Sequence, residues 1–289
     1  MFYNSASFKG GTDSFHNLSH CMNVEHRYRE FLPEARRIVV KIGTRVIAQP
    51  SGRPDMRPLR SLVKQVAELH RKGYEILLVS SGAVGAGIEA LGMKARPTDV
   101  PDLQMCAAVG QARLMAHYEE LFGAENIVIG QVLLTHADFQ HRIRFTNAKR
   151  TMEHMIRRQV IPIINENDVV ADEEIKAGLS LGDNDYLAAL VVKLTRADLL
   201  VILSTVDGVL DAEGERVHCI ENINEAFAWV KPTEAGGLSK GSMDSKLRAA
   251  QIAAKSGSTV VIAGGRTKNV LTRIMAGDDV GTLILSSAL

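Results

Sequence analysis

The amino-acid sequence predicts a three-layer α/β/α sandwich with a mainly parallel central sheet. From Arg37 onward, short apolar runs rich in β-branched residues alternate with segments of helical periodicity. This alternation is typical of a parallel sheet covered by helices. No Pro- or Gly-rich linker, change of composition or repeat of fixed period divides the chain. We therefore expect one compact domain with two lobes.

The expected strands are the apolar runs at residues 38–41, 76–80, 127–133, 160–164, 199–203, 259–263 and 282–285. The first expected helix covers residues 58–72, where Leu and Val recur at helical spacing and Gly73 is placed to end the helix. Further helices are expected over residues 102–122, 139–159, 185–195, 243–255 and 268–275, and a small-residue turn at 80–87 opens another. Residues 169–181 suggest a hairpin, and residues 205–222 a polar excursion.

The first 35 residues are polar and rich in Ser, Asn, His and Phe, without the continuous apolar core of a secretory signal. They predict a flexible leader or a short extra element, and residues 36–289 form the expected folded domain. His16, His20, Cys21 and His26 could suggest a metal site, but their spacing fits no standard zinc pattern. An unstructured polar tail is the preferred interpretation.

Composition argues against several classes of function. The 289 residues include 34 basic and 33 acidic ones, for a net charge of +1, so the sequence predicts no broad electrostatic footprint for nucleic acid or anionic lipid. The apolar runs are far shorter than the roughly 20 residues that a membrane-spanning helix needs. Three widely separated cysteines, Cys21, Cys106 and Cys219, argue against a disulfide framework and predict a reducing compartment, the cytoplasm.

The first two strands end in groups suited to phosphate. Lys41 lies at the end of the first strand, and the missing side chain of Gly43 would let a ligand approach backbone N–H groups. After the second strand, Ser81 and Gly82 open a helix whose first N–H groups form an anion site. Each feature alone also has a plain explanation, a solvated strand-end lysine in one case and close helix-on-strand packing in the other.

Two clusters of carboxylates and amides frame the expected hairpin. Residues 165–168 read Asn-Glu-Asn-Asp directly after the fourth strand, and residues 182–185 read Gly-Asp-Asn-Asp at the start of the next helix. Asp or Asn at a helix start is common capping chemistry, so Asp183 alone would be a plain N-cap. Together, such groups can grip an α-amino group, orient lysines and hold Mg²⁺ through water.

Two later segments fit a nucleotide site. The fifth strand runs into Ser204 and Thr205, followed by an Asp-Gly turn, which suits a nucleotide edge or a simple hairpin turn. A Gly/Ser-rich loop then leads from Lys240 to Lys246 at the start of a helix, where two lysines and the helix N-terminus make a second anion site. A flexible linker with a capped helix is the alternative there.

With these residues assembled, the chain resembles the amino acid kinase family, and within it the glutamate kinase branch. The likeness covers residues 37–285 through ordered motifs: V-V-K-I-G-T at 39–44, S-S-G-A-V at 80–84, A-A-V-G-Q at 107–111, I-N-E-N-D at 164–168 and G-D-N-D at 182–185. The second and fourth motifs favour this branch over the acetylglutamate, aspartate, carbamate and UMP kinases. We expect the chain to lack the small C-terminal RNA-modification-type domain that many bacterial members carry.

The resemblance implies a role for each matching residue. Lys41 and Lys246 would contact the phosphates as catalytic residues, and Asp185 would hold both lysines in position. The implied glutamate-binding residues are Ser81, Gly82, Asn165, Asp168, Asp183 and Asn184. The implied ATP-binding residues are Lys41, Gly43, Ser204, Thr205, Lys240, Gly241, Ser242, Met243, Asp244, Ser245 and Lys246. Residues 240–243 read Lys-Gly-Ser-Met where the family usually has Gly-Gly-Met, and no residue is assigned as a metal ligand.

The implied reaction is phosphorylation of the L-glutamate γ-carboxylate by ATP with Mg²⁺, the first step of proline biosynthesis. The resemblance also implies a homodimer or homotetramer, feedback inhibition by proline, and transfer of the product to the reductase glutamate-5-semialdehyde dehydrogenase. A related kinase acting on acetylglutamate or aspartate, and a non-catalytic amino-acid sensor, remain as alternatives. Both lysines and Asp185 argue against the sensor, and the missing glycine fingerprint argues against a dinucleotide-dependent oxidoreductase.

Overall fold

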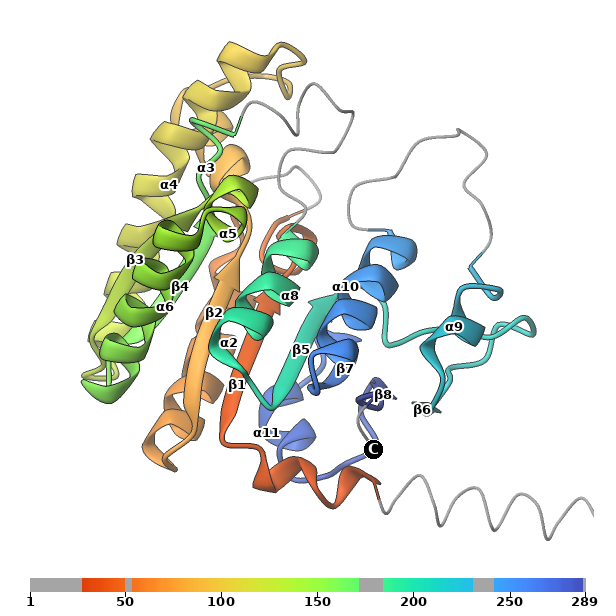
Figure 1. The fold of residues 1–289 in the computed structure, drawn as a ribbon. Coiled ribbons are helices and arrows are strands. Elements are labelled where there is room, and N and C mark those ends of the chain that lie inside the picture. Colours follow the sequence, from red (N-terminus) through yellow and green to blue (C-terminus); the bar gives the residue numbers. More distant parts are fainter. Residues whose placement is uncertain (1–27, 50–53, 172–183, 231–241, 288–289) are drawn as a thin grey trace, which may run out of the picture.

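A computed structural model describes residues 28–49, 54–171, 184–230 and 242–287 of the protein, and Figure 1 shows their arrangement. Eight strands form one sheet in the order β3-β4-β2-β1-β5-β7-β8-β6. Neighbouring strands in this order are parallel, except that β7 and β8 are antiparallel. The expected mainly parallel sheet is confirmed.

All seven expected strands are present, with bounds that differ from the expected ones by a few residues at most. They are β1 (Arg37–Ile42), β2 (Glu75–Ser80), β3 (Ile129–Leu134), β4 (Ile161–Glu166), β5 (Leu199–Ser204), β7 (Thr259–Gly264) and β8 (Thr282–Ile284). The additional strand, β6 (Cys219–Ile220), has two residues and lies in the segment expected as a polar excursion. The hairpin expected at 169–181 falls mostly outside the described residues.

Helices cover both faces of the sheet, and each face has its own apolar core (Figure 1). On one face pack α2 (Met56–Arg71), α4 (Val100–Gly123) and α11 (Val270–Ile274). On the other face pack α6 (Arg142–Arg157), α8 (Asn184–Thr195), α9 (Ile223–Ala226) and α10 (Met243–Lys255). The α/β/α sandwich is therefore confirmed, and its buried parallel strands explain why the strand sequences are almost continuously apolar.

The prediction of a single helix over residues 139–159 is wrong, because the structure divides this segment into two helices. α5 (His136–Gln140) begins earlier, where Thr135 and Asp138 form a capping box, and α6 begins at Arg142. Between the two helices, His141 has extended backbone with φ −92° and ψ 110°. Its Nδ1 accepts a hydrogen bond from the N–H of Arg144 at 3.5 Å. A side chain that caps the next helix competes with continuation of the previous one.

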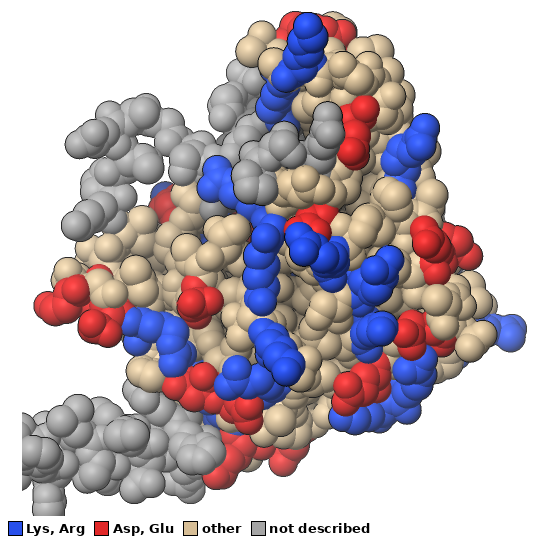
Figure 2. Space-filling model, turned by 180° about the vertical axis from the view of Figure 1, so that it is seen from behind, with Lys and Arg blue, Asp and Glu red and all other residues tan. Residues whose placement is uncertain are grey.

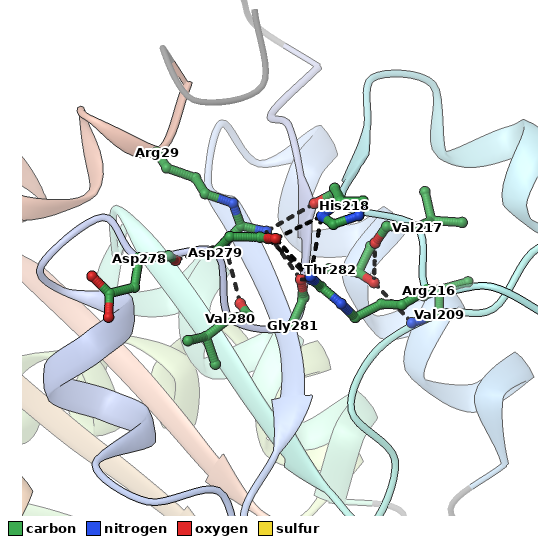
Figure 3. Close-up of polar contacts among 10 residues, drawn as sticks. All are labelled: Arg29, Val209, Arg216, Val217, His218, Asp278, Asp279, Val280, Gly281 and Thr282. Carbon is green, nitrogen blue, oxygen red and sulfur yellow. Dashed lines mark hydrogen bonds and ion pairs between the residues drawn. The ribbon is translucent and has the colours of Figure 1, made fainter. Parts of the chain in front are cut away.

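The end of the expected leader docks on a distant part of the chain through Arg29 (Figure 3). The Arg29 side chain is buried, and its guanidinium donates to the carbonyls of His218 and Gly281 at 2.9 Å each. Two more carbonyls of the turn before β8 accept from the same group, and Asp279 pairs with it at 3.1 Å. Residues 28–36 are thus attached to the β6 and β8 end of the sheet, whereas residues 1–27 lie outside the described part.

Asp279 is shared between two arginines at this junction (Figure 3). Arg216 reaches the Oδ2 of Asp279 at 2.7 Å, while Arg29 lies at the other carboxylate oxygen. Burial alone would raise the pKa of Asp279, but the hydrogen bond and charge of Arg216, with those of Arg29 and His218, lower it. The carboxylate therefore stays ionised and helps to hold the buried guanidinium.

We expect Arg29→Ala to lower the free energy of unfolding by about 2–4 kcal/mol, because it leaves several buried carbonyls without a donor. Arg36→Ala is the matched control, since the Arg36 side chain is 80% exposed and pairs with Glu75 at 3.4 Å. That change should cost less than about 1 kcal/mol. Urea denaturation of both variants measures the difference, and equal midpoints would contradict the role given to Arg29.

The surface behind the sheet carries charges of both signs. Figure 2 shows Lys and Arg side chains on this face lying among Asp and Glu side chains. Ion pairs on the protein surface include Arg71 with Glu125 at 2.6 Å and Arg273 with Asp278 at 2.8 Å. Among the helices that the structure describes, none is long and apolar enough to cross a membrane.

Candidate active site

A cavity of about 300 Å³ lies at the carboxyl ends of the central strands β1, β2, β4 and β5. Parallel strands point these ends to one edge of the sheet, so segments far apart in the sequence meet there. Most of the expected site residues within the described ranges line this cavity: Lys41, Gly43, Ser81, Gly82, Asn165, Asp168, Asn184, Ser204, Thr205 and Lys246.

Two buried lysines flank one buried carboxylate. Lys41 Nζ lies 2.7 Å from Asp185 Oδ1, and Lys246 Nζ lies 3.2 Å from Asp185 Oδ2. Lys41 comes from β1, whereas Asp185 and Lys246 lie in the first turns of α8 and α10. Burial alone would raise the pKa of Asp185, but the two ammonium charges lower it below its usual value. Asp185 therefore stays ionised and keeps both ammonium groups at the cavity.

The start of α10 is built around the same carboxylate. Ser242 is the N-cap residue, and its Oγ accepts a hydrogen bond from the N–H of Ser245 at 3.3 Å. The Ser245 hydroxyl donates to Asp185 Oδ2 at 3.2 Å. Lys246 Nζ also lies 3.4 Å from the Ser242 carbonyl. The capping contacts thereby fix the direction of the Lys246 side chain.

A cluster of amides and hydroxyls forms another part of the wall. The Nδ2 of Asn184 lies 2.8 Å from the Ser80 carbonyl, 2.9 Å from Ser81 Oγ and 2.9 Å from Asn165 Oδ1. The Asn184 Oδ1 is buried and has no hydrogen-bond partner within the described part of the chain. A buried acceptor without a partner is costly, so this oxygen indicates a ligand that brings a donor. The buried carboxylate of Asp168 lines the same cavity.

Helix α3 (Ala83–Ala90) opens beside these groups. Gly82 precedes it with φ +110°, a conformation that side-chain-bearing residues rarely adopt. The first residues of α3 line the cavity, and N–H groups at a helix N-terminus attract anions. Two ammonium groups and a helix start thus suit a polyanion, whereas the amide cluster and Asp168 suit a ligand with an amino group.

Comparison with known proteins agrees with this geometry. The model of the amino acid kinase family matches residues 36–264. A glutamate 5-kinase from Clostridium acetobutylicum is 39% identical over 270 residues, which cover 91% of this chain and 98% of that relative. The chain belongs to the amino acid kinase family. Glutamate 5-kinases from Symbiobacterium thermophilum (42% identity, 88% of this chain and 98% of the relative) and Nitrosococcus oceani (43%, 89% and 69%) assign it to the glutamate 5-kinase branch.

Solved structures show the same fold at low sequence identity. The carbamate kinase from Giardia lamblia bound to AMP-PNP superposes with a TM-score of 0.59 at 17% identity, covering 88% of this chain and 99% of that one. The N-acetylglutamate synthase from Neisseria gonorrhoeae, complexed with coenzyme A and L-arginine, gives 0.58 at 15% identity, covering 91% and 65%. These likenesses support the amino acid kinase fold.

In this amino acid kinase, the A-A-V-G-Q motif brings α4 into backbone contact with α3. A Cβ atom placed on Gly110 of α4 would overlap the carbonyl oxygen of Ala83 in α3. A Cβ atom on Gly87 of α3 would overlap the carbonyl oxygen of Cys106 in α4. The two glycines therefore allow a crossing without intervening side chains, and this crossing sets the position of the α3 start at the cavity.

We expect Gly110→Ala to destabilise the protein by about 3 kcal/mol, because the added methyl group must push α3 away from α4. The same displacement moves the α3 start and should lower kcat/KM. Gly123→Ala is the matched control near the end of the same helix, where an added Cβ meets nothing within 4 Å. It should be neutral or slightly stabilising. Thermal unfolding of the two variants checks this, and similar melting temperatures would contradict the tight crossing.

The expected ATP-binding residues differ in their surroundings. Ser204 and Thr205 line the cavity at the end of β5. The side chain of Met243 packs against an apolar core, and that of Asp244 pairs with Arg248 at 2.7 Å. That these two residues contact the nucleotide stays a prediction. Because their side chains are engaged elsewhere, such contacts would be made by their backbone atoms. Asp183, Lys240 and Gly241 lie outside the described residues.

Four polar residues in the described part of the site were not assigned to it from the sequence. Thr44, Arg45 and Arg96 line the cavity, and the Oε1 of Gln111 accepts a hydrogen bond from Asn165 Nδ2 at 2.8 Å. Arg45 and Arg96 are exposed and add positive charge near the cavity. Arg45 directly follows the V-V-K-I-G-T motif and Gln111 ends the A-A-V-G-Q motif, so their positions in the sequence could have placed both at the site. The loop that carries Arg96 contains no such motif.

Proposed function

We propose that this protein transfers the γ-phosphoryl group of ATP to the γ-carboxylate of L-glutamate, giving γ-glutamyl phosphate and ADP. The observation that carries this function is the pair of buried lysines on Asp185, beside an amide cluster in which Asn184 Oδ1 has no hydrogen-bond partner among the described residues. The first feature suits phosphates and the second suits an amino acid. The glutamate 5-kinase relatives identify glutamate as the substrate to test first.

The chemistry needs no general base. A glutamate carboxylate, with a pKa of about 4.3, is already ionised and nucleophilic at neutral pH. One of its oxygens forms a bond to the γ-phosphorus while the bond from that phosphorus to the β,γ-bridging oxygen breaks, and ADP leaves with the electron pair. The protein therefore has to hold two anions in line and offset negative charge on the transferred group.

Each buried group has a part in that task. Lys41 and Lys246 donate hydrogen bonds to the phosphate oxygens, and Asp185 aims the two ammonium groups. Ser204 and Thr205 lie at the nucleotide end of the cavity. Within the described ranges, no cluster of three metal-ligating side chains occurs. Mg²⁺ would enter with the nucleotide phosphates, keep several waters and supply further positive charge.

The amino-acid end of the cavity supports glutamate as the acceptor. Asn184 Oδ1 and the Asp168 carboxylate are acceptors, which suit the α-ammonium group of an amino acid. Acetylglutamate lacks this charge and is bulkier at the same atom. Ser81 Oγ, the α3 start and Gly82 suit the α-carboxylate. An aspartate kinase, the other related activity, would need a site shorter by one methylene.

An assay of ADP release with glutamate, aspartate and acetylglutamate tests this function. We expect kcat/KM for glutamate to exceed that for the other two acids by at least about a hundredfold. Acetylglutamate loses the charged hydrogen bond of the ammonium group, and aspartate has a shorter chain that misplaces its carboxylate. A preference for either rival acid would assign the protein to the related kinase. ATP-independent binding of amino acids with no turnover would instead support the sensor.

The wider role follows from the product. We propose that the enzyme acts in a reducing cytoplasm, in agreement with the three widely separated cysteines of the sequence. Glutamyl phosphate is a reactive mixed anhydride, so it should pass to a reductase, glutamate-5-semialdehyde dehydrogenase, as the first step of proline biosynthesis. Assembly into a homodimer or homotetramer and feedback inhibition by proline are part of the same proposal, and light scattering and inhibition by proline test them.

A further inference from the structure

Gln111 connects the amide cluster of the active site to a second, more open hollow. This hollow, of about 290 Å³, is lined by α4 and by residues at the ends of β3 and β4, and Gln111 lies on its wall. We infer that Gln111 is a positioning residue that holds the Asn165 amide in place against Asn184, and so makes the site select an acid with an α-ammonium group. This inference rests on the proposed glutamate kinase activity.

The backbone sets the direction of both asparagine amides. The carbonyl of Ser80 can only accept, so the atom of Asn184 that lies 2.8 Å from it must be the NH₂ group. The N–H of Glu166 can only donate, so the atom of Asn165 at 2.9 Å must be the carbonyl oxygen. Asn184 Oδ1 is therefore left to face a ligand, and Asn165 Nδ2 is left to find an acceptor.

Gln111 supplies that acceptor. Its Oε1 receives the Asn165 Nδ2 hydrogen bond at 2.8 Å, and its own Nε2 donates to Gln131 Oε1 at 3.4 Å. In the reverse orientation, the Gln111 and Asn165 NH₂ groups would face each other without an acceptor. If Gln111 lost its oxygen, the Asn165 amide would turn toward another acceptor and withdraw its Oδ1 from Asn184.

The consequence for specificity lies at the Asn184 oxygen. This oxygen is a buried acceptor, so a substrate ammonium group that donates a hydrogen bond to it replaces the hydrogen bond to water that burial removed. A dicarboxylate without the amino group, such as glutarate, leaves the oxygen unpartnered and is disfavoured. Discrimination between glutamate and glutarate therefore reports on the contact between Asn165 and Asn184 that Gln111 supports.

The test compares Gln111→Met, which removes the acceptor at similar size, with Gln111→Glu, which keeps an acceptor oxygen. For Gln111→Met we expect the glutamate KM to rise about ten- to a hundredfold. The ATP KM, kcat and the inhibition constant of glutarate should stay within about threefold of the wild-type values. Gln111→Glu should retain the wild-type glutamate KM within about threefold. Gln111 is only half-buried, so its truncation should cost little packing. Gln111→Ala therefore provides a second variant without the acceptor.

Gln65→Met is the matched structural control. Gln65 is a buried glutamine on α2, and its Oε1 accepts from the N–H of Leu271 at 2.8 Å. Its replacement should lower the melting temperature and leave both ligand constants unchanged. If wild-type protein phosphorylates glutamate but Gln111→Met and Gln111→Ala keep the wild-type preference for glutamate over glutarate, the inference about Gln111 is overturned and the proposed function stands. Wild-type protein that does not phosphorylate glutamate would overturn the proposed function, and this inference with it.

Discussion

Replacing Lys246 with methionine should lower kcat by about a hundred- to a thousandfold and leave the fold intact. The ammonium group of Lys246 is buried at the cavity and is available to offset charge that develops on the transferred phosphoryl group. Removal of one such preorganised donor in other enzymes has effects of this size. The methionine keeps most of the apolar stem, so packing should change little. Steady-state kinetics at saturating ATP and glutamate measure the loss.

Lys255→Met provides the control for this change, because Lys255 is an exposed lysine in the last turn of the same helix α10. Its replacement should leave kcat within about twofold of the wild-type value, since surface substitutions away from a site change little. Circular dichroism establishes that both variants are folded. Full turnover by a folded Lys246→Met protein would remove Lys246 from the catalytic apparatus.

Asp185→Asn should reduce both stability and turnover. The substitution leaves two ammonium groups buried without their shared counter-charge, since the side chains of Lys41 and Lys246 are only 6% and 5% exposed. Breaking a buried ion pair by removing one partner costs about 3–5 kcal/mol. We expect a loss of unfolding free energy in this range, together with a fall of at least about a hundredfold in kcat because the lysines are no longer aimed.

The pH dependence of stability gives the same variant a second readout. The folded-state pKa of Asp185 is lowered from 3.8, so its stabilising contribution is fully present above that value and is lost as pH falls through the folded-state pKa. The amide group that replaces this carboxylate in the variant cannot titrate, so this part of the acid destabilisation should disappear. Asp244→Asn is the control, because Asp244 pairs with Arg248 at a partly exposed site. Equal acid sensitivity of the two variants would contradict the buried role.

The central sheet and the site could be predicted because their signals are local and repeated. Strands buried on both faces have nearly continuous apolar sequences, as β5 does, and their carboxyl ends necessarily meet at one edge. Polar groups directly after such runs, among them Lys41, Ser81 and Asn165, therefore had to lie together. Ordered motifs with matching spacing then identified the branch of the family.

Other features depend on contacts that sequence patterns do not encode. The division between α5 and α6 depends on the His141 side chain capping α6, whereas the apolar periodicity of the two helices suggested one. Arg29 is polar and lies in a polar segment, yet it is buried because a distant turn presents several carbonyls to it. The direction of the Asn184 amide follows from the carbonyl of Ser80, a backbone group that every residue has.

Isotope transfer from the acceptor tests the central claim most directly, because it follows the oxygen that attacks phosphorus. Wild-type protein is incubated with ATP and glutamate labelled with ¹⁸O in the γ-carboxylate, and hydroxylamine traps the product by attack at its acyl carbon. If the carboxylate is the nucleophile, the released phosphate carries one ¹⁸O atom and the hydroxamate of glutamate accumulates in equal amount. Phosphate without ¹⁸O would mean that water attacks ATP, and would contradict the assignment of this cavity as a glutamate kinase site.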